Sequence, residues 1–321
     1  MLKQHFQTKR VVGSDVTLMI VSDMPDAVAE QLLEILWGIA FRFERQFSRF
    51  IPESELSLFN RTGGRRRHIS PAFRELLLAA KSMTEVTGGL YNPFILPALQ
   101  RAGYTKSFMP GHENDVQDDY SNRLVVSVDN FEVGDEWAKI PYGTSIDMGG
   151  CGKGYLADQL AACLPDEVVG FWFSLGGDIV AGGHDENRKP WTVRIADSST
   201  LDNLSPFIFQ PINFDTFAVA TSDTNVRRGT STDTKDWHHI IDPRTERPSM
   251  SDVRVASVYC DKGIDADVLA SCAVILGSEK AVPFLKSRNV RAALLQTYDG
   301  KNVKFGRSLR LNKNVKAVAH A

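Results

Sequence analysis

The second half of the chain consists of short β-rich runs, and helical patterns separate only some of them. The strand-like runs cover residues 168–175, 192–195, 216–221, 253–260 and 290–296, and the helical patterns cover 154–164, 266–276 and 280–287. Strands that do not alternate regularly with helices argue against a parallel βαβ sheet. The pattern therefore predicts an α+β fold, with mixed sheets and flanking helices.

The first half of the chain is more helical. A strand is expected over 16–21, and apolar residues at helical spacing then predict a long amphipathic helix over 26–47. A second helix should begin after Ser70, a suitable N-cap, with Pro71 in its first turn, and end at 87–89. Residues 103–136 are polar and weakly patterned, which indicates a loop-rich insertion. No repeat or linker divides the chain, so we expect a single domain over 1–321.

Charge and cysteine content exclude several classes of protein. A net charge of −2 and a pI of about 6.4 give no electrostatic case for a nucleic-acid partner. The four cysteines lie far apart, which argues against a zinc site or a disulfide framework. The start of the chain lacks the pattern of a signal peptide, and charged residues interrupt its most apolar early segment, so we expect no membrane span. These observations together predict a cytoplasmic protein.

The stretch SIDMGGCGKGYLADQL, residues 145–160, joins a glycine-rich loop to a helical pattern. A P-loop would need a glycine where Asp147 stands and a hydroxyl where Gly154 stands, and the even spacing of the glycines also fails the dinucleotide pattern. A tight turn is therefore one interpretation. The other is an anion site, because glycines let backbone N–H groups approach a phosphate and Lys153 adds positive charge at the helix start.

Three further stretches carry polar residues of catalytic type. They are FSLGGDIVAGG, WHHIIDPRTERP and DADVLASCAVILG, which contain Gly176, Gly177 and Asp178, then His238 and His239, then Asp267 and Ser271. The last two residues stand four apart, so one helix face could present both to a shared ligand. Each stretch also has a purely structural interpretation, as a turn, a packed histidine or a helix-start aspartate. In a strand, one of the adjacent histidines would point inward and the other outward.

The order of these stretches resembles that of the FAD:protein FMN transferases, the ApbE-type flavin transferase family. The similarity runs from about residue 47 to 277, and also includes SRFIPESELSLFN, TGGLYNPFILPAL and AVATSDT. It implies a single-domain flavin-transferase fold that binds FAD and Mg²⁺. It further implies transfer of FMN from FAD to a threonine or serine hydroxyl of an acceptor protein, with release of AMP.

The resemblance also implies roles for individual residues. Asp267, Ser271 and the carbonyl of Gly152 are expected to hold Mg²⁺, since all three offer hard oxygen ligands. His239 is the expected base for the attacking hydroxyl, and Asp267 joins it as a catalytic residue. The residues expected to bind FAD are Asn92, Asp147, Lys153, Gly176, Gly177, Asp178 and Thr245.

The chain departs from the family pattern at several positions. Asn92 replaces an aspartate, Asp223 and Glu246 replace glycines, and Ser271 replaces a threonine. The two added carboxylates could repel a phosphate, so the departures bear on FAD affinity more than on the metal. Two alternatives to transfer therefore stay open: a non-catalytic FAD-binding protein, and an FAD pyrophosphatase that yields FMN and AMP.

Overall fold

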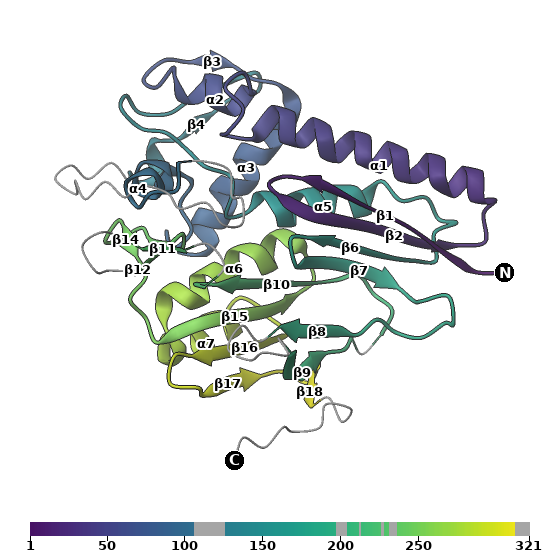
Figure 1. The fold of residues 1–321 in the computed structure, drawn as a ribbon. Helices are drawn as coiled ribbons and strands as arrows, with labels where there is room; N and C mark the ends of the chain where they lie inside the picture. The colour runs from purple at the N-terminus through teal and green to yellow at the C-terminus, as the bar shows by residue number, and fades with distance from the viewer. Residues whose placement is uncertain (106–125, 197–203, 212, 226–227, 231–235, 312–321) are drawn as a thin grey trace.

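A central antiparallel sheet organises the fold (Figure 1). The computed structural model describes residues 1–105, 126–196, 204–211, 213–225, 228–230 and 236–311. Within these residues the sheet has eight strands in the order β1-β2-β6-β7-β10-β15-β16-β17, and every neighbouring pair is antiparallel. Their bounds are Lys3–Val11, Ser14–Ser22, Gly170–Leu175, Asp178–Gly183, Phe217–Asp223, Val253–Cys260, Ala292–Thr297 and Asn302–Phe305.

The sheet separates two apolar cores because successive side chains point to opposite faces. In β10, Ala218 and Ala220 belong to the larger core, whereas Phe217 and Val219 belong to the smaller one. Both faces of the central strands are buried, and every residue of β15 is buried. This accounts for the nearly continuous apolar runs of these strands in the sequence.

Helices cover the face of the sheet that carries the larger core (Figure 1). α1 (Asp26–Phe47) packs on β1 and β2, α5 (Gly152–Ala162) on β6 and β7, and α6 (Gly263–Leu276) on β10 and β15. α1 buries one stripe that includes Leu33, Leu36 and Trp37, as its spacing predicts. α6 is buried on nearly all sides, between the sheet, α5 and α7 (Ser278–Lys286).

Smaller elements complete the molecule. A three-stranded sheet of β18, β9 and β8 packs on the other face of the central sheet; its strands are Leu309–Leu311, Leu204–Phe209 and Val193–Ala196. α2 (Glu55–Asn60) contacts α1, α3 (Pro71–Val86) contacts the 3-10 turn η1 (Pro93–Ile95), and η1 contacts α4 (Leu96–Arg101). The short strands pair as β3-β5-β4 (Arg67–His68, Trp137–Lys139, Glu132–Val133), β11-β12 (Arg228–Thr230, Asp236–His238) and β13-β14 (Ile241–Asp242, Arg247–Pro248).

Most predicted elements are confirmed. α1 has the predicted bounds, and Ser70 caps α3 by accepting a hydrogen bond from the backbone N–H of Phe73. The strand β1 was not predicted. Of the expected insertion over 103–136, residues 106–125 lie outside the described residues, and the described remainder contains the 3-10 turn η2 (Val128–Asn130) and β4.

The structure also bears on the expectations for the cysteines and for a membrane span. All four cysteines are free thiols, three of them buried, and burial raises the pKa of Cys151 and of Cys272 to about 12. Such thiols act as packing residues. Within the described residues, no helix combines the length and apolar character needed to cross a bilayer.

Candidate active site

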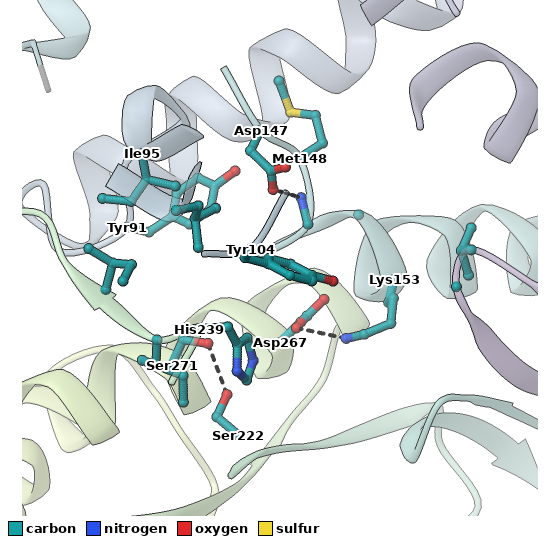
Figure 2. A pocket seen from close by; sticks show the side chains of 18 of the residues that line it. Tyr91, Ile95, Tyr104, Asp147, Met148, Lys153, Ser222, His239, Asp267 and Ser271 are labelled. Atoms are coloured by element: carbon teal, nitrogen blue, oxygen red, sulfur yellow. Dashed lines mark hydrogen bonds and ion pairs between the residues drawn. The ribbon is translucent and has the colours of Figure 1, made fainter. Parts of the chain in front are cut away.

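A cavity of about 310 Å³ is lined by residues of α5 and α6, of the C-terminal end of α1 and of the loop that precedes α5 (Figure 2). This volume lies within the usual range of small-ligand sites. Its walls come from segments far apart in the sequence, and they include nine of the eleven predicted site residues: Asn92, Asp147, Gly152, Lys153, Gly176, Asp178, His239, Asp267 and Ser271. Gly177 and Thr245 are not among its lining residues.

A lysine between two aspartates forms one corner of the cavity. Lys153, in the first turn of α5, forms ion pairs with Asp178 and with Asp267, whose Oδ1 lies 3.3 Å from the Lys153 Nζ. The other oxygen of Asp267 accepts a hydrogen bond of 3.1 Å from the backbone N–H of Gly154. Two carboxylates facing one ammonium leave this corner with a net negative charge, which favours an additional cation.

Asp178 is a second buried carboxylate of this corner. It lies at the start of β7, and its Oδ1 accepts a 3.1 Å hydrogen bond from the backbone N–H of Thr221 in β10. Burial raises the pKa of Asp178 above its ordinary value, against the attraction of Lys153, and the nearby charge of Asp267 adds to the rise. Asp178 therefore connects β10 of the central sheet with Lys153 at the cavity.

Asp267 and Ser271 lie one turn apart on α6, and both line the cavity, as their spacing predicts. The Ser271 hydroxyl lies 2.9 Å from the Ser222 hydroxyl at the end of β10 (Figure 2). Among the described residues, no three His, Cys, Asp or Glu side chains cluster in a way that could hold a metal ion. A metal here would need hydroxyl or carbonyl oxygens beside Asp267, a donor set that suits Mg²⁺ and does not suit zinc.

Arg49 is a lining residue whose role the sequence did not indicate. Its Nε lies 2.7 Å from Asp147 Oδ2, and both side chains are more than nine-tenths buried. The guanidinium lies against the rings of Phe50 and Tyr104, at 4.1 and 4.6 Å from their centroids. The other oxygen of Asp147 accepts a 2.6 Å hydrogen bond from the N–H of Gly149. Asp147 is therefore neutralised, and it fixes both Arg49 and the glycine-rich loop.

The two adjacent histidines have different environments. His238 is buried: its Nδ1 accepts a hydrogen bond from the N–H of Ile240, and its Nε2 lies 3.0 Å from the carbonyl of Ser249. These contacts require the neutral tautomer protonated at Nε2, and burial lowers the pKa of His238. His239 instead lines the cavity, with its ring edge-on to that of Tyr104 at 6.4 Å. Of the two histidines, only His239 lines the cavity.

Several predicted binding residues have structural reasons of their own. Gly176 and Gly177 form the two-residue turn between β6 and β7, with φ angles of 64° and 97°. Such a turn requires positive φ at both positions, which favours glycine. The Asn92 side chain accepts a hydrogen bond from Phe94 N–H and donates one to the carbonyl of Val126. Thr245 lies in the turn between β13 and β14, where its N–H bonds the carbonyl of Asp242.

The two added carboxylates differ in position. Asp223 lines the cavity, and its side chain accepts a 2.7 Å hydrogen bond from the N–H of Asn225. Glu246 is not a lining residue; it is buried and forms an ion pair with Arg101 of α4. Its backbone has a φ of 57°, the left-handed region in which glycine is favoured. Of these two carboxylates, only Asp223 can therefore add negative charge to the cavity.

Comparison with known proteins places the chain in a family. A family model described as the ApbE family matches residues 12–295. The chain belongs to the ApbE family. Its relatives include proteins named FAD:protein FMN transferase, from Treponema pallidum (24% identical, covering 89% of this chain and 82% of the relative) and from Klebsiella pneumoniae (25% identical, covering 89% and 87%).

Solved structures share the fold of this ApbE-family chain. The ApbE protein of Thermotoga maritima matches it with a TM-score of 0.81 at 20% identity, over 97% of each chain. The flavinyl transferase ApbE of Pseudomonas stutzeri, in its apo form, matches with a TM-score of 0.79 at 20% identity, over 96% of each chain. The predicted α+β fold and the family resemblance are both confirmed.

Proposed function

We propose that this chain is a Mg²⁺-dependent FAD:protein FMN transferase that modifies a threonine or serine hydroxyl of an acceptor protein. The observation that carries the proposal is the common cavity in which an oxygen-rich, negatively charged corner faces His239. Family membership and relatives named FAD:protein FMN transferase support the same activity.

The reaction exchanges the phosphoanhydride bond of FAD for a phosphoester bond to the acceptor. The acceptor oxygen attacks the FMN-side phosphorus of FAD, the bond from that phosphorus to the bridging oxygen breaks, and AMP leaves with the bridging oxygen. His239 takes the hydroxyl proton as a general base. Lys153 and the positive end of the α5 helix dipole offer positive charge to the pyrophosphate.

The residues present fit a Mg²⁺ ion at the negatively charged corner. Asp267, Ser271 and the Gly152 carbonyl would hold it, and when bound it would neutralise the charge that develops on the phosphate oxygens. Asp178 holds Lys153 in place beside this corner. Catalysis of this kind depends mainly on positioning and charge stabilisation, which these buried groups supply.

One experiment separates transfer from its alternatives. The protein is incubated with FAD, Mg²⁺ and a candidate acceptor, and the products are analysed by intact mass and nucleotide chromatography. We expect the acceptor to gain the mass of an FMN group while AMP appears in equal amount, and both to disappear in EDTA. AMP release without a modified acceptor would identify an FAD pyrophosphatase. FAD that stays bound and unchanged would identify a storage protein, and either outcome would contradict the proposal.

A further inference from the structure

We propose that Asp158 is a positioning residue, which holds α6 against α5 so that the two halves of the metal corner meet. This inference rests on the proposed function, because the proposed ligands are divided between the two helices. Gly152 and Lys153 lie in the first turn of α5, while Asp267 and Ser271 lie on α6. A shift of one helix along the other would separate them.

Asp158 caps α6 from a different helix. Its Oδ1 accepts a 2.6 Å hydrogen bond from the N–H of Gly263, and its Oδ2 accepts a 3.0 Å bond from the N–H of Ile264. The residue at the N-cap position of α6, Lys262, makes no side-chain capping bond of its own. First-turn N–H groups have no partner inside their helix, so a carboxylate that binds two of them fixes the helix start.

A close backbone contact lies beside this cap. A Cβ on Gly154 would come within 2.2 Å of the Gly263 carbonyl oxygen, and a Cβ on Gly263 would come within 2.6 Å of the Gly154 carbonyl oxygen. The same Gly154 donates its N–H to Asp267, one turn further along α6. The cap, the glycine contact and the carboxylate of Asp267 thus form a continuous set of contacts between the helices.

Asp158 itself is not a cavity-lining residue, so its effect on the site must act through the helix it holds. Its burial raises the pKa of its carboxyl group, which the two N–H groups of α6 oppose. Desolvation disfavours the charge of this carboxylate, and both of its oxygens bind the start of α6. These contacts are those expected of a residue that holds a helix in place. Loss of groups that orient metal ligands typically weakens metal affinity by about 10–100-fold.

The test compares Asp158→Asn with a control that loses a cap elsewhere. Asp252 accepts hydrogen bonds from the N–H and hydroxyl of Ser278 at the start of α7, and neither residue lines the cavity. For wild type, Asp158→Asn and Asp252→Asn, the melting temperature is measured with FAD over a Mg²⁺ titration. FMN transfer is followed over the same titration.

We expect both variants to lose some stability without Mg²⁺, but only Asp158→Asn to shift the Mg²⁺ midpoint upward by about 10-fold or more. Excess Mg²⁺ should then restore much of its transfer rate. An unchanged midpoint, or equal shifts in both variants, would overturn the positioning role while the wild-type Mg²⁺ response stands. A wild type without any Mg²⁺ response would overturn the proposed function, and this inference with it. If Asp158→Asn does not fold, the same two measurements are made on Asp158→Glu. This variant keeps the charge but lengthens the side chain by one methylene, which should push the two helices apart.

Discussion

At the scale of single residues, His238 and His239 show how neighbours of the same type acquire different chemistry. Both nitrogens of His238 have backbone contacts, so its ring is held neutral and cannot exchange a proton with a substrate. His239 points into the cavity that also contains Asp267. His238 is the last residue of β12, and His239 lies in the bend that follows it.

Changing His239 to alanine should therefore slow FMN transfer by about 10²–10⁴-fold, which is the usual contribution of a general base. FAD binding should change little, since the phosphate-facing groups remain. Single-turnover rates and FAD titrations measure the two effects. His238→Ala serves as the control, and a larger loss of chemistry in that variant at equal folded fraction would refute the assignment.

His238 should also make global stability depend on pH. Burial lowers its pKa in the folded state below the ordinary value of 6.5, so the unfolded chain binds the proton first as pH falls. The stabilisation contributed by the neutral ring is thus complete above about pH 6.5 and is lost as pH falls through the lowered pKa. Urea unfolding between pH 5 and 8 should show this slope, and His238→Gln should flatten it. An equal slope in both proteins would contradict the prediction.

The proposed metal ligands differ in charge, which predicts unequal effects. Asp267→Asn should weaken Mg²⁺ binding more than Ser271→Ala does, and should remove most of the rate, because Asp267 supplies the only formal negative charge among the ligands. Mg²⁺ titrations and melting curves of both variants measure this. If Asp267 were only a helix-start residue, its variant would lose about 0.3–1 kcal/mol of stability and keep a normal Mg²⁺ response.

At the scale of secondary-structure elements, two helical glycines have opposite roles. Gly154 of α5 lies against the backbone of α6, whereas a Cβ at Gly38, in the exposed part of α1, would meet nothing within 4 Å. Gly154→Ala should therefore destabilise the protein by about 1–3 kcal/mol through overpacking. Gly38→Ala should stabilise it by up to about 1 kcal/mol, because alanine favours the helix. Denaturant midpoints compare the two, and similar midpoints would contradict the close approach of the helices.

An element could be predicted from the sequence where its own residues carry a recognisable pattern. α1 has a repeating apolar stripe, and Ser70 with Pro71 marks the start of α3, so both were predictable. β1 was missed because it is an edge strand with polar residues on much of its length, and only its pairing with β2 defines it. Such pairing has no counterpart in local spacing.

At the scale of the whole molecule, the site residues that could be predicted lie in stretches with a local pattern, and those that could not depend on contacts between distant stretches. Lys153 and the pair on α6 stand in short stretches whose own spacing drew attention to them, and the family resemblance indicated His239. Arg49 was missed because its partner Asp147 is 98 residues away, and neither local sequence indicates the other. For Glu246, the sequence suggested repulsion of a phosphate, and only the structure revealed the compensating Arg101.

The division of the cavity between distant segments has a consequence for biosynthesis. The chain leaves the ribosome N-terminus first, so Asp147 and Lys153 emerge more than a hundred residues before Ser271. Until α6 emerges and packs beside β10, the growing polypeptide lacks the residues that complete the negatively charged corner. Prematurely terminated products that end before α6 would therefore be unable to consume FAD, and flavin turnover would begin only with a nearly finished polypeptide.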